Sequence, residues 1–160
     1  MIKVFKFGGA SVKDANGVKN LVKVLKTTGH DKTLVVISAM GKTTNALEVV
    51  IDNYFNNKKE LHSSLQDIIK YHNSILFDLF ENDKHVVYKK VAYLFDELNT
   101  FFDRNKAPDY NFVYDQVICF GELISTTIVS EYLNDIGYKN NWLDVRELIK
   151  TDSYYRNAKV

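Results

Sequence analysis

The first forty residues alternate between two short apolar runs and one amphipathic segment. Residues 2–7 and 33–37 are β-branched and aromatic, and each run ends in small residues, as buried strands of a parallel sheet do. Between them, apolar residues follow the i, i+3, i+4, i+7 spacing of one helix face, at Val18, Leu21, Val22 and Leu25. We expect Asp14 to cap this helix and Gly29 to end it. The pattern predicts a βαβ unit with a right-handed crossover.

Two long amphipathic stripes fill the middle of the chain. The first consists of Leu61, Leu65, Ile68, His72, Ile75, Leu76 and Leu79, and the second of Val87, Val91, Leu94, Leu98 and Phe101. Because only the polar segment ENDKH separates them, we expect an antiparallel helical hairpin over about residues 58–104, packed on the sheet. A further helix over residues 112–136 and a third strand within residues 138–145 complete the prediction.

Composition and charge narrow the class of protein. The chain has 160 residues, of which 46% are hydrophobic, enough for one domain with a core and the hairpin as an insertion. Its 21 basic residues nearly balance 20 acidic ones, so no global field favours nucleic acid or an anionic membrane. No unbroken apolar run approaches the roughly 18 to 20 residues that span a bilayer. With a single cysteine and no apolar leader, we expect a soluble cytoplasmic protein.

The end of the first predicted strand has the features of a phosphate site. Lys6 alternates with apolar neighbours there, and Gly8 and Gly9 follow it. Open α/β sheets bind ligands at this end of their strands. Glycines let backbone N–H groups approach an anion, and the helix that follows adds the positive end of its dipole. The alternative is a lysine that extends its charge to solvent before an ordinary Gly-Gly turn.

A second loop, residues 38–45, follows the second predicted strand and is small and hydroxyl-rich. Its GKTT sequence is not a Walker loop, because the glycine needed five residues before Gly41 is Val36. Because this loop lies at the same edge of the predicted sheet as the first loop, it could contribute to binding a ligand. The alternative is a turn in which Thr44 or Asn45 caps the next helix.

Glu122 is a carboxylate within an otherwise apolar helical stretch. A buried carboxylate needs a partner, which would be a ligand ammonium or a lysine elsewhere in the fold. We expect His72 to be a packing residue and Cys119 a buried thiol rather than a nucleophile. The histidines show no metal-ligand spacing, so we predict no protein-built metal site.

The motifs VFKFGGASV, SAMGKTTN and FGELIS occur in this order, separated by the helical insertion, and LDVRELIKTD follows them. Together they resemble the N-terminal part of the aspartokinases, of the amino-acid kinase superfamily, including those fused to a homoserine dehydrogenase. The resemblance implies a three-layer α/β/α sandwich with a mostly parallel sheet. It also implies transfer of the ATP γ-phosphoryl group to the side-chain carboxylate of L-aspartate, giving 4-phospho-L-aspartate for lysine, threonine and methionine synthesis.

The resemblance assigns nucleotide roles to the first loop. Lys6 matches the catalytic lysine that stabilises the transferring phosphoryl group, and Gly8 and Gly9 match the backbone donors to ATP phosphates. Ser11 matches the hydroxyl just beyond them. The family pattern has threonine or serine where this chain has Ala10, so a hydroxyl contact expected there would fall to Ser11 or to the backbone. Mg²⁺ is implied as the ion carried by ATP.

On the substrate side, Ser38 and Thr44 match positions of the second loop, and Glu122 matches the carboxylate that receives the α-ammonium of aspartate. Family members continue with a second half of the kinase domain and then regulatory domains or a homoserine dehydrogenase. The chain ends at Val160. We therefore expect it to be an incomplete N-terminal piece that is inactive alone, from a protein that is a homo-oligomer at full length.

Two alternatives remain open at this point. Another member of the superfamily would act on glutamate, acetylglutamate or a nucleotide, although the long hairpin resembles the insertion of aspartokinases. A non-catalytic interaction module would use the hairpin as its docking face. An exposed apolar patch on the hairpin would favour the module, and a buried hairpin would not.

Overall fold

The predicted βαβ unit forms the N-terminal part of the fold. The computed structural model describes residues 1–160, apart from the side chain of Asn157. Strands β1 (Lys3–Phe7) and β2 (Thr33–Ile37) pair in parallel. They are joined by η1 (Gly9–Val12), a 3₁₀ turn, and α1 (Ala15–Thr28). The two expected ends of α1 are confirmed, because Asp14 Oδ1 accepts from the Gly17 N–H at 2.8 Å and Gly29 follows with φ of 77°.

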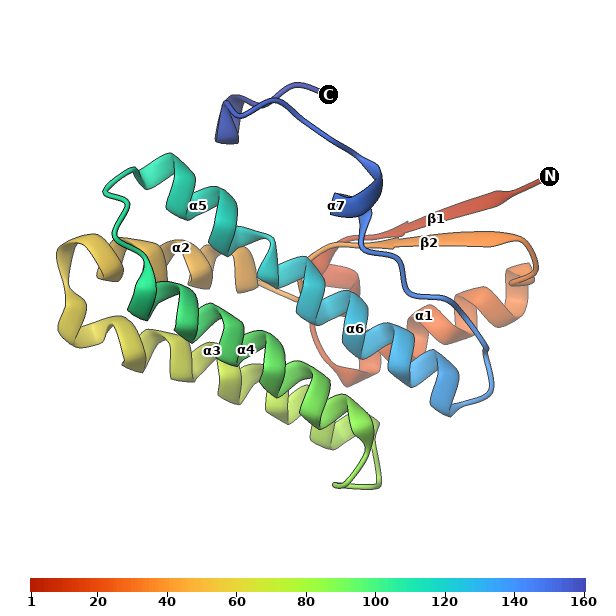
Figure 1. Ribbon diagram of the computed structural model, residues 1–160. Helices are drawn as coiled ribbons and strands as arrows, with labels where there is room; N and C mark the ends of the chain where they lie inside the picture. The colour runs from red at the N-terminus through yellow and green to blue at the C-terminus, as the bar shows by residue number, and fades with distance from the viewer.

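The two faces of this small sheet differ in burial. On one face, side chains of Phe5, Phe7, Val35 and Ile37 join the hydrophobic core, and α1 lies along that side of the strands (Figure 1). On the other face, Val4 is 62% exposed, Leu34 47% and Val36 44%. The strands are therefore buried on one face only in the described residues, where the sequence predicted burial on both.

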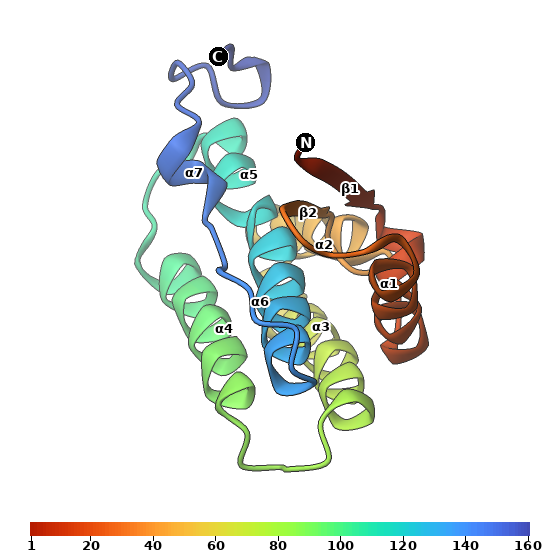
Figure 2. The same ribbon diagram turned by 90° about the vertical axis from the view of Figure 1, so that its right-hand side faces the viewer.

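The hairpin is present as α3 (Lys58–Leu79) and α4 (Val86–Arg104), joined by residues 80–85. All seven positions predicted for the first stripe are buried. In α4, however, the buried residues include Phe95 and Phe102, whereas Leu94 and Phe101 are half-buried. The stripe is rotated because α4 packs chiefly against α6 (Phe120–Asp135), and α3 chiefly against α2 (Thr43–Asn56). Figure 2 shows α6 between α3 and α4.

The predicted helix over residues 112–136 is two helices, α5 (Tyr110–Ile118) and α6, which meet at Cys119. By length and composition alone, Tyr110–Asp135 could cross a membrane, although charged and polar residues interrupt its apolar sequence. Core helices of soluble proteins pass the same test. Since α6 packs on α4 and α5 on α2, with Ile124 and Ile128 fully buried, we interpret the pair as core helices.

The predicted strand within residues 138–145 is absent. Asn140 Nδ2 donates to the carbonyl oxygen of Ser130 at 3.1 Å, and Trp142 Nε1 donates to Thr126 Oγ1 at 2.9 Å. These bonds hold the segment along α6, where no strand neighbours it among the described residues. The chain then forms the short helix α7 (Val145–Leu148) and the 3₁₀ turn η2 (Tyr155–Asn157).

Candidate functional site

Two loops at the carboxyl ends of β1 and β2 touch each other. The N–H of Gly41 donates to the carbonyl oxygen of Gly9 at 3.0 Å. A Cβ atom on Gly9 would lie 2.6 Å from the carbonyl oxygen of Ala39 and 2.9 Å from that of Gly41. Because these neighbours are backbone atoms, only glycine fits at position 9. The first and second loops therefore form one unit at this edge of the sheet.

Lys6 lies at the entrance of this unit. It occupies the exposed face of β1, opposite Val36 of β2, and its Nζ atom comes within 3.5 Å of the position that a Cβ on Gly8 would take. None of the ion pairs in the described part of the chain involves Lys6. A cation thus lies directly over the first glycine of the loop.

The turn after the glycines differs from the expectation. The first element is the 3₁₀ turn η1, in which the Ser11 N–H donates to the carbonyl oxygen of Gly8 at 2.8 Å. The longer helix α1 starts only at Ala15, and the carboxylate of Asp14 already caps it. The positive end of α1 therefore lies beyond the glycines, next to the carboxylate of Asp14, rather than directly after them. The side chain of Ser11 is exposed.

The first turn of α6 brings Glu122 against the second loop. Its Oε1 atom accepts from the Ala39 N–H at 3.2 Å, and Ser125 Oγ donates to the carbonyl oxygen of Ser38 at 2.9 Å. A Cβ on Gly121 would lie 2.9 Å from that of Ala39, so α6 comes this close only because residue 121 is glycine. The partner of Glu122 is a backbone amide rather than a lysine, and the carboxylate keeps its capacity to accept further bonds.

The start of α2 corrects another expectation. The helix begins at Thr43 with Lys42 as its N-cap, and no side chain caps it. Thr44 and Asn45 lie in its first turn, so neither caps the helix as the alternative interpretation of this loop required. Instead, the buried Thr43 donates from Oγ1 to the carbonyl oxygen of Met40 at 2.6 Å and holds the loop in shape.

His72 is the packing residue that the sequence predicted. It is fully buried, and its Nδ1 lies 2.8 Å from the carbonyl oxygen of Ile68. Burial lowers the pKa of its imidazole to about 4, so the ring is neutral near pH 7. The contact of Nε2 with Thr43 Oγ1, at 3.4 Å, connects α3 to the second loop, and no pattern in the sequence indicated this contact.

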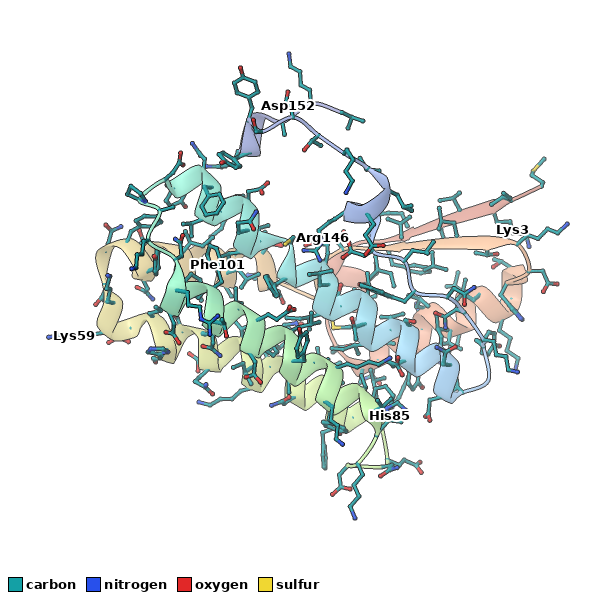
Figure 3. All side chains as sticks on the ribbon, viewed as in Figure 1. Lys3, Lys59, His85, Phe101, Arg146 and Asp152 are labelled. Carbon is teal, nitrogen blue, oxygen red and sulfur yellow. The ribbon has the colours of Figure 1, made fainter. Side chains whose placement is uncertain are left out.

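Cys119 lies at the α5–α6 junction, three residues before Glu122. Arg146, which pairs with Asp144 at 2.6 Å, directs Nη1 to Cys119 Sγ at 3.5 Å (Figure 3). Burial raises the pKa of the thiol, although Arg146 opposes this effect. The thiol is therefore protonated near pH 7, which disfavours a nucleophilic role.

Side chains that could hold a metal ion do not gather at these loops. No group of three or more His, Cys, Asp or Glu residues with suitable geometry occurs among the described residues. A cavity of about 440 Å³ lies elsewhere, between α4, α6 and Trp142. The chemistry that the loop cluster offers is an ammonium group, close backbone and a carboxylate.

Comparisons with known proteins agree on one family. The sequence profile of the amino acid kinase family matches residues 1–160. Aspartokinase 1, chloroplastic, of Arabidopsis thaliana is 31% identical over 166 aligned residues, which cover 94% of this chain and 27% of that protein. Crystal structures of Escherichia coli aspartokinase III superpose with a TM-score of 0.86. The complex with lysine and aspartate (T-state) is 25% identical, and that with aspartate and ADP (R-state) 24%. The chain covers 34% of each of those chains.

Proposed function

Because the chain belongs to the amino acid kinase family, we propose that it supplies part of the active site of an aspartate kinase. This enzyme transfers the γ-phosphoryl group of ATP to the side-chain carboxylate of L-aspartate and produces 4-phospho-L-aspartate. The aspartokinase relatives and the neighbour bound to aspartate and ADP support the assignment. The observation that carries it is the convergence of Lys6, the Gly8–Gly9 loop and Glu122 around the second loop.

Lys6 is the residue that we assign to catalysis. Phosphoryl transfer is chiefly a problem of positioning and of charge on the transferring oxygens. An ammonium that reaches over Gly8 from the end of a strand can stabilise that charge. Gly8 and Gly9 would offer backbone N–H groups to ATP phosphates, and the hydroxyl of Ser11 would lie just beyond them. The close packing of Gly9 against Ala39 keeps this loop fixed.

Glu122 is the residue that we assign to aspartate. Its carboxylate would accept the α-ammonium of the substrate while it stays bonded to the Ala39 N–H. Ser38 and Thr44 flank this loop and would contact the substrate from the same side. Since an ammonium–carboxylate contact forms in the ground state, this pair contributes to affinity more than to the chemical step.

Mg²⁺ is the usual ion of such a reaction, and when bound to the nucleotide it neutralises phosphate charge. The described residues provide no acidic cluster for it near Lys6. We propose that the ion enters with ATP. Lys6 and the backbone of the first loop would meet the phosphates of that complex.

We also propose that these 160 residues do not complete the reaction alone. One face of the sheet is exposed around Lys6, so nothing described here encloses an adenine or excludes water from the phosphates. Losing modest positioning can cost a factor of a hundred or more in rate. We expect the chain by itself to bind ATP weakly and to release no ADP in response to aspartate.

An acceptor assay on the intact gene product tests the function. ATP and Mg²⁺ are combined separately with L-aspartate, L-glutamate or N-acetyl-L-glutamate, and ADP release is recorded together with acyl phosphate trapped by hydroxylamine. The proposal predicts product with aspartate at least ten times faster than with the other acceptors. Preference for another acceptor would favour a different member of the superfamily.

The hairpin does not favour the interaction module. Its two buried stripes pack against α2 and α6, so these faces are occupied inside the domain. The large apolar side chains that the hairpin exposes are Phe77, Val86 and Tyr93, and isolated apolar side chains on a surface are common.

A further inference from the structure

The middle of α3 reaches the two loops of the candidate site. Tyr71 Oη donates a hydrogen bond to the carbonyl oxygen of Lys13, directly after the first loop. The same hydroxyl lies 2.5 Å from the position that a Cβ on Gly41 would occupy. Gly41 has φ of 56° and bonds to Gly9. Tyr71 thus stands between the end of the first loop and the turn of the second.

His72, the next residue, reaches the far end of the second loop. Its Nε2 atom contacts Thr43 Oγ1, and this hydroxyl donates to the carbonyl oxygen of Met40. Two other contacts hold the ring in place. Its Nδ1 atom is bonded to the carbonyl oxygen of Ile68, and the ring of Phe95 packs edge-on against it, with 5.8 Å between the ring centroids. Because Nδ1 carries the ring proton, Nε2 is an acceptor, and the single hydroxyl proton of Thr43 is shared between Nε2 at 3.4 Å and the carbonyl oxygen of Met40 at 2.6 Å. A fixed ring therefore restricts where the hydroxyl of Thr43 can lie.

We propose that Tyr71 and His72 are positioning residues through which the inserted hairpin fixes the separation of the first and second loops. The hairpin is thereby part of the support of the site, in addition to its role in the core. The kinetic consequence rests on the proposed function. The structural consequence, that the two loops are rigid, does not depend on the proposed function.

Conservative variants separate this role from general packing. Tyr71→Phe keeps the ring and removes only the bond to Lys13. His72→Asn keeps a polar group near Nδ1 and loses the contact with Thr43, whereas His72→Gln places an amide near the Nε2 position. Tyr54→Phe is the matched control, because Tyr54 Oη donates to a backbone carbonyl, that of Asn105, at 2.9 Å at the far end of the hairpin.

Amide hydrogen exchange on the intact gene product tests the structural part. In Tyr71→Phe and His72→Asn we expect the amides of Ser11 and Gly41 to exchange at least ten times faster than in the wild type. Tyr54→Phe should leave both rates unchanged, and His72→Gln should recover part of the protection. Unchanged loop amides in both variants, or an equal acceleration throughout α4 and α6, would overturn the proposal.

Kinetics on the intact gene product test the second part. At a temperature where all variants are folded, kcat for aspartate phosphorylation should fall at least tenfold in Tyr71→Phe and His72→Asn, with little change in Tyr54→Phe. Loosened loops with wild-type kcat would contradict the positioning role. A wild-type protein that phosphorylates no aspartate would contradict the proposed function instead, and the exchange rates would still decide whether the hairpin fixes the loops.

Discussion

At the scale of single residues, the candidate site depends on two opposite charges with different surroundings. Lys6 is exposed and has no ion-pair partner among the described residues, whereas Glu122 is half-buried and bonded to a backbone amide. The first arrangement suits a charge that meets a mobile phosphate, and the second suits a fixed acceptor for an ammonium. Substituting each residue should therefore change different kinetic constants.

Glu122→Gln keeps the shape of the side chain and removes its charge. We expect the KM for aspartate to rise about ten- to a hundredfold while kcat changes much less, because the contact is made before the chemical step. Initial rates over a range of aspartate and ATP concentrations measure both constants. If the KM for ATP rose and that for aspartate did not, Glu122 would be assigned to the wrong ligand.

The buried imidazole of His72 makes stability depend on pH. Its pKa of about 4 in the folded state lies below the ordinary value of 6.5, so the unfolded chain binds more protons between these values. Stability from this group is complete above pH 6.5 and falls by up to roughly 3 kcal/mol as the pH drops to 4. Urea unfolding at several pH values, compared with His72→Asn, measures this difference. Parallel curves would show that His72 does not titrate in this way.

Several site residues could be found from the sequence and others could not. Lys6, Gly8, Gly9 and Glu122 stand in local motifs, and the structure brings them to one edge of the sheet, while their chemical roles remain predictions. The bond from Ala39 to Glu122 joins positions 83 residues apart. Such a contact depends on the packing of α6, which a local motif does not specify.

At the scale of elements, the hairpin should stabilise the core through its buried stripes. Leu98 is fully buried on α4, so Leu98→Ala should lower the free energy of unfolding by about 2 to 5 kcal/mol. Leu94 lines the cavity beside Trp142 and is half-buried. Leu94→Ala is the matched control, for which we expect a smaller loss, below about 1.5 kcal/mol.

Chemical denaturation of the two variants measures the difference. Equal losses at both positions would mean that the stripe of α4 faces the interior as the sequence predicted, with Leu94 inside. That prediction held only in part at Leu94 and Phe101, which pack against the core but are half-buried, because the periodicity gives a face of the helix but not its partner. The sequence of residues 138–145, which predicted a third strand, likewise did not reveal that Asn140 and Trp142 bond to α6. The βαβ unit was predictable because its caps and turns are local.

At the scale of the whole molecule, we expect the exposed face of the sheet to determine whether the chain self-associates in solution. Ile2, Val4, Leu34 and Val36 form an apolar surface beside unpaired strand edges, a combination that promotes pairing between chains. We expect the isolated 160-residue chain to self-associate as its concentration rises from about 1 to 100 µM. Sedimentation velocity should show less association for Leu34→Lys. A monomer throughout this range would contradict the expectation.

The assignment of Lys6 to phosphoryl transfer is tested by the effect of Lys6→Ala on the turnover of aspartate by the intact gene product. Lys3→Ala is the control, because Lys3 lies on the same strand but donates to the carbonyl oxygens of Thr28 and Gly29, away from the loops. We expect Lys6→Ala to lower kcat by a factor of about a thousand or more, equivalent to about 4 kcal/mol, while the protein stays folded and Lys3→Ala retains kcat. Near-normal turnover in folded Lys6→Ala protein would contradict it.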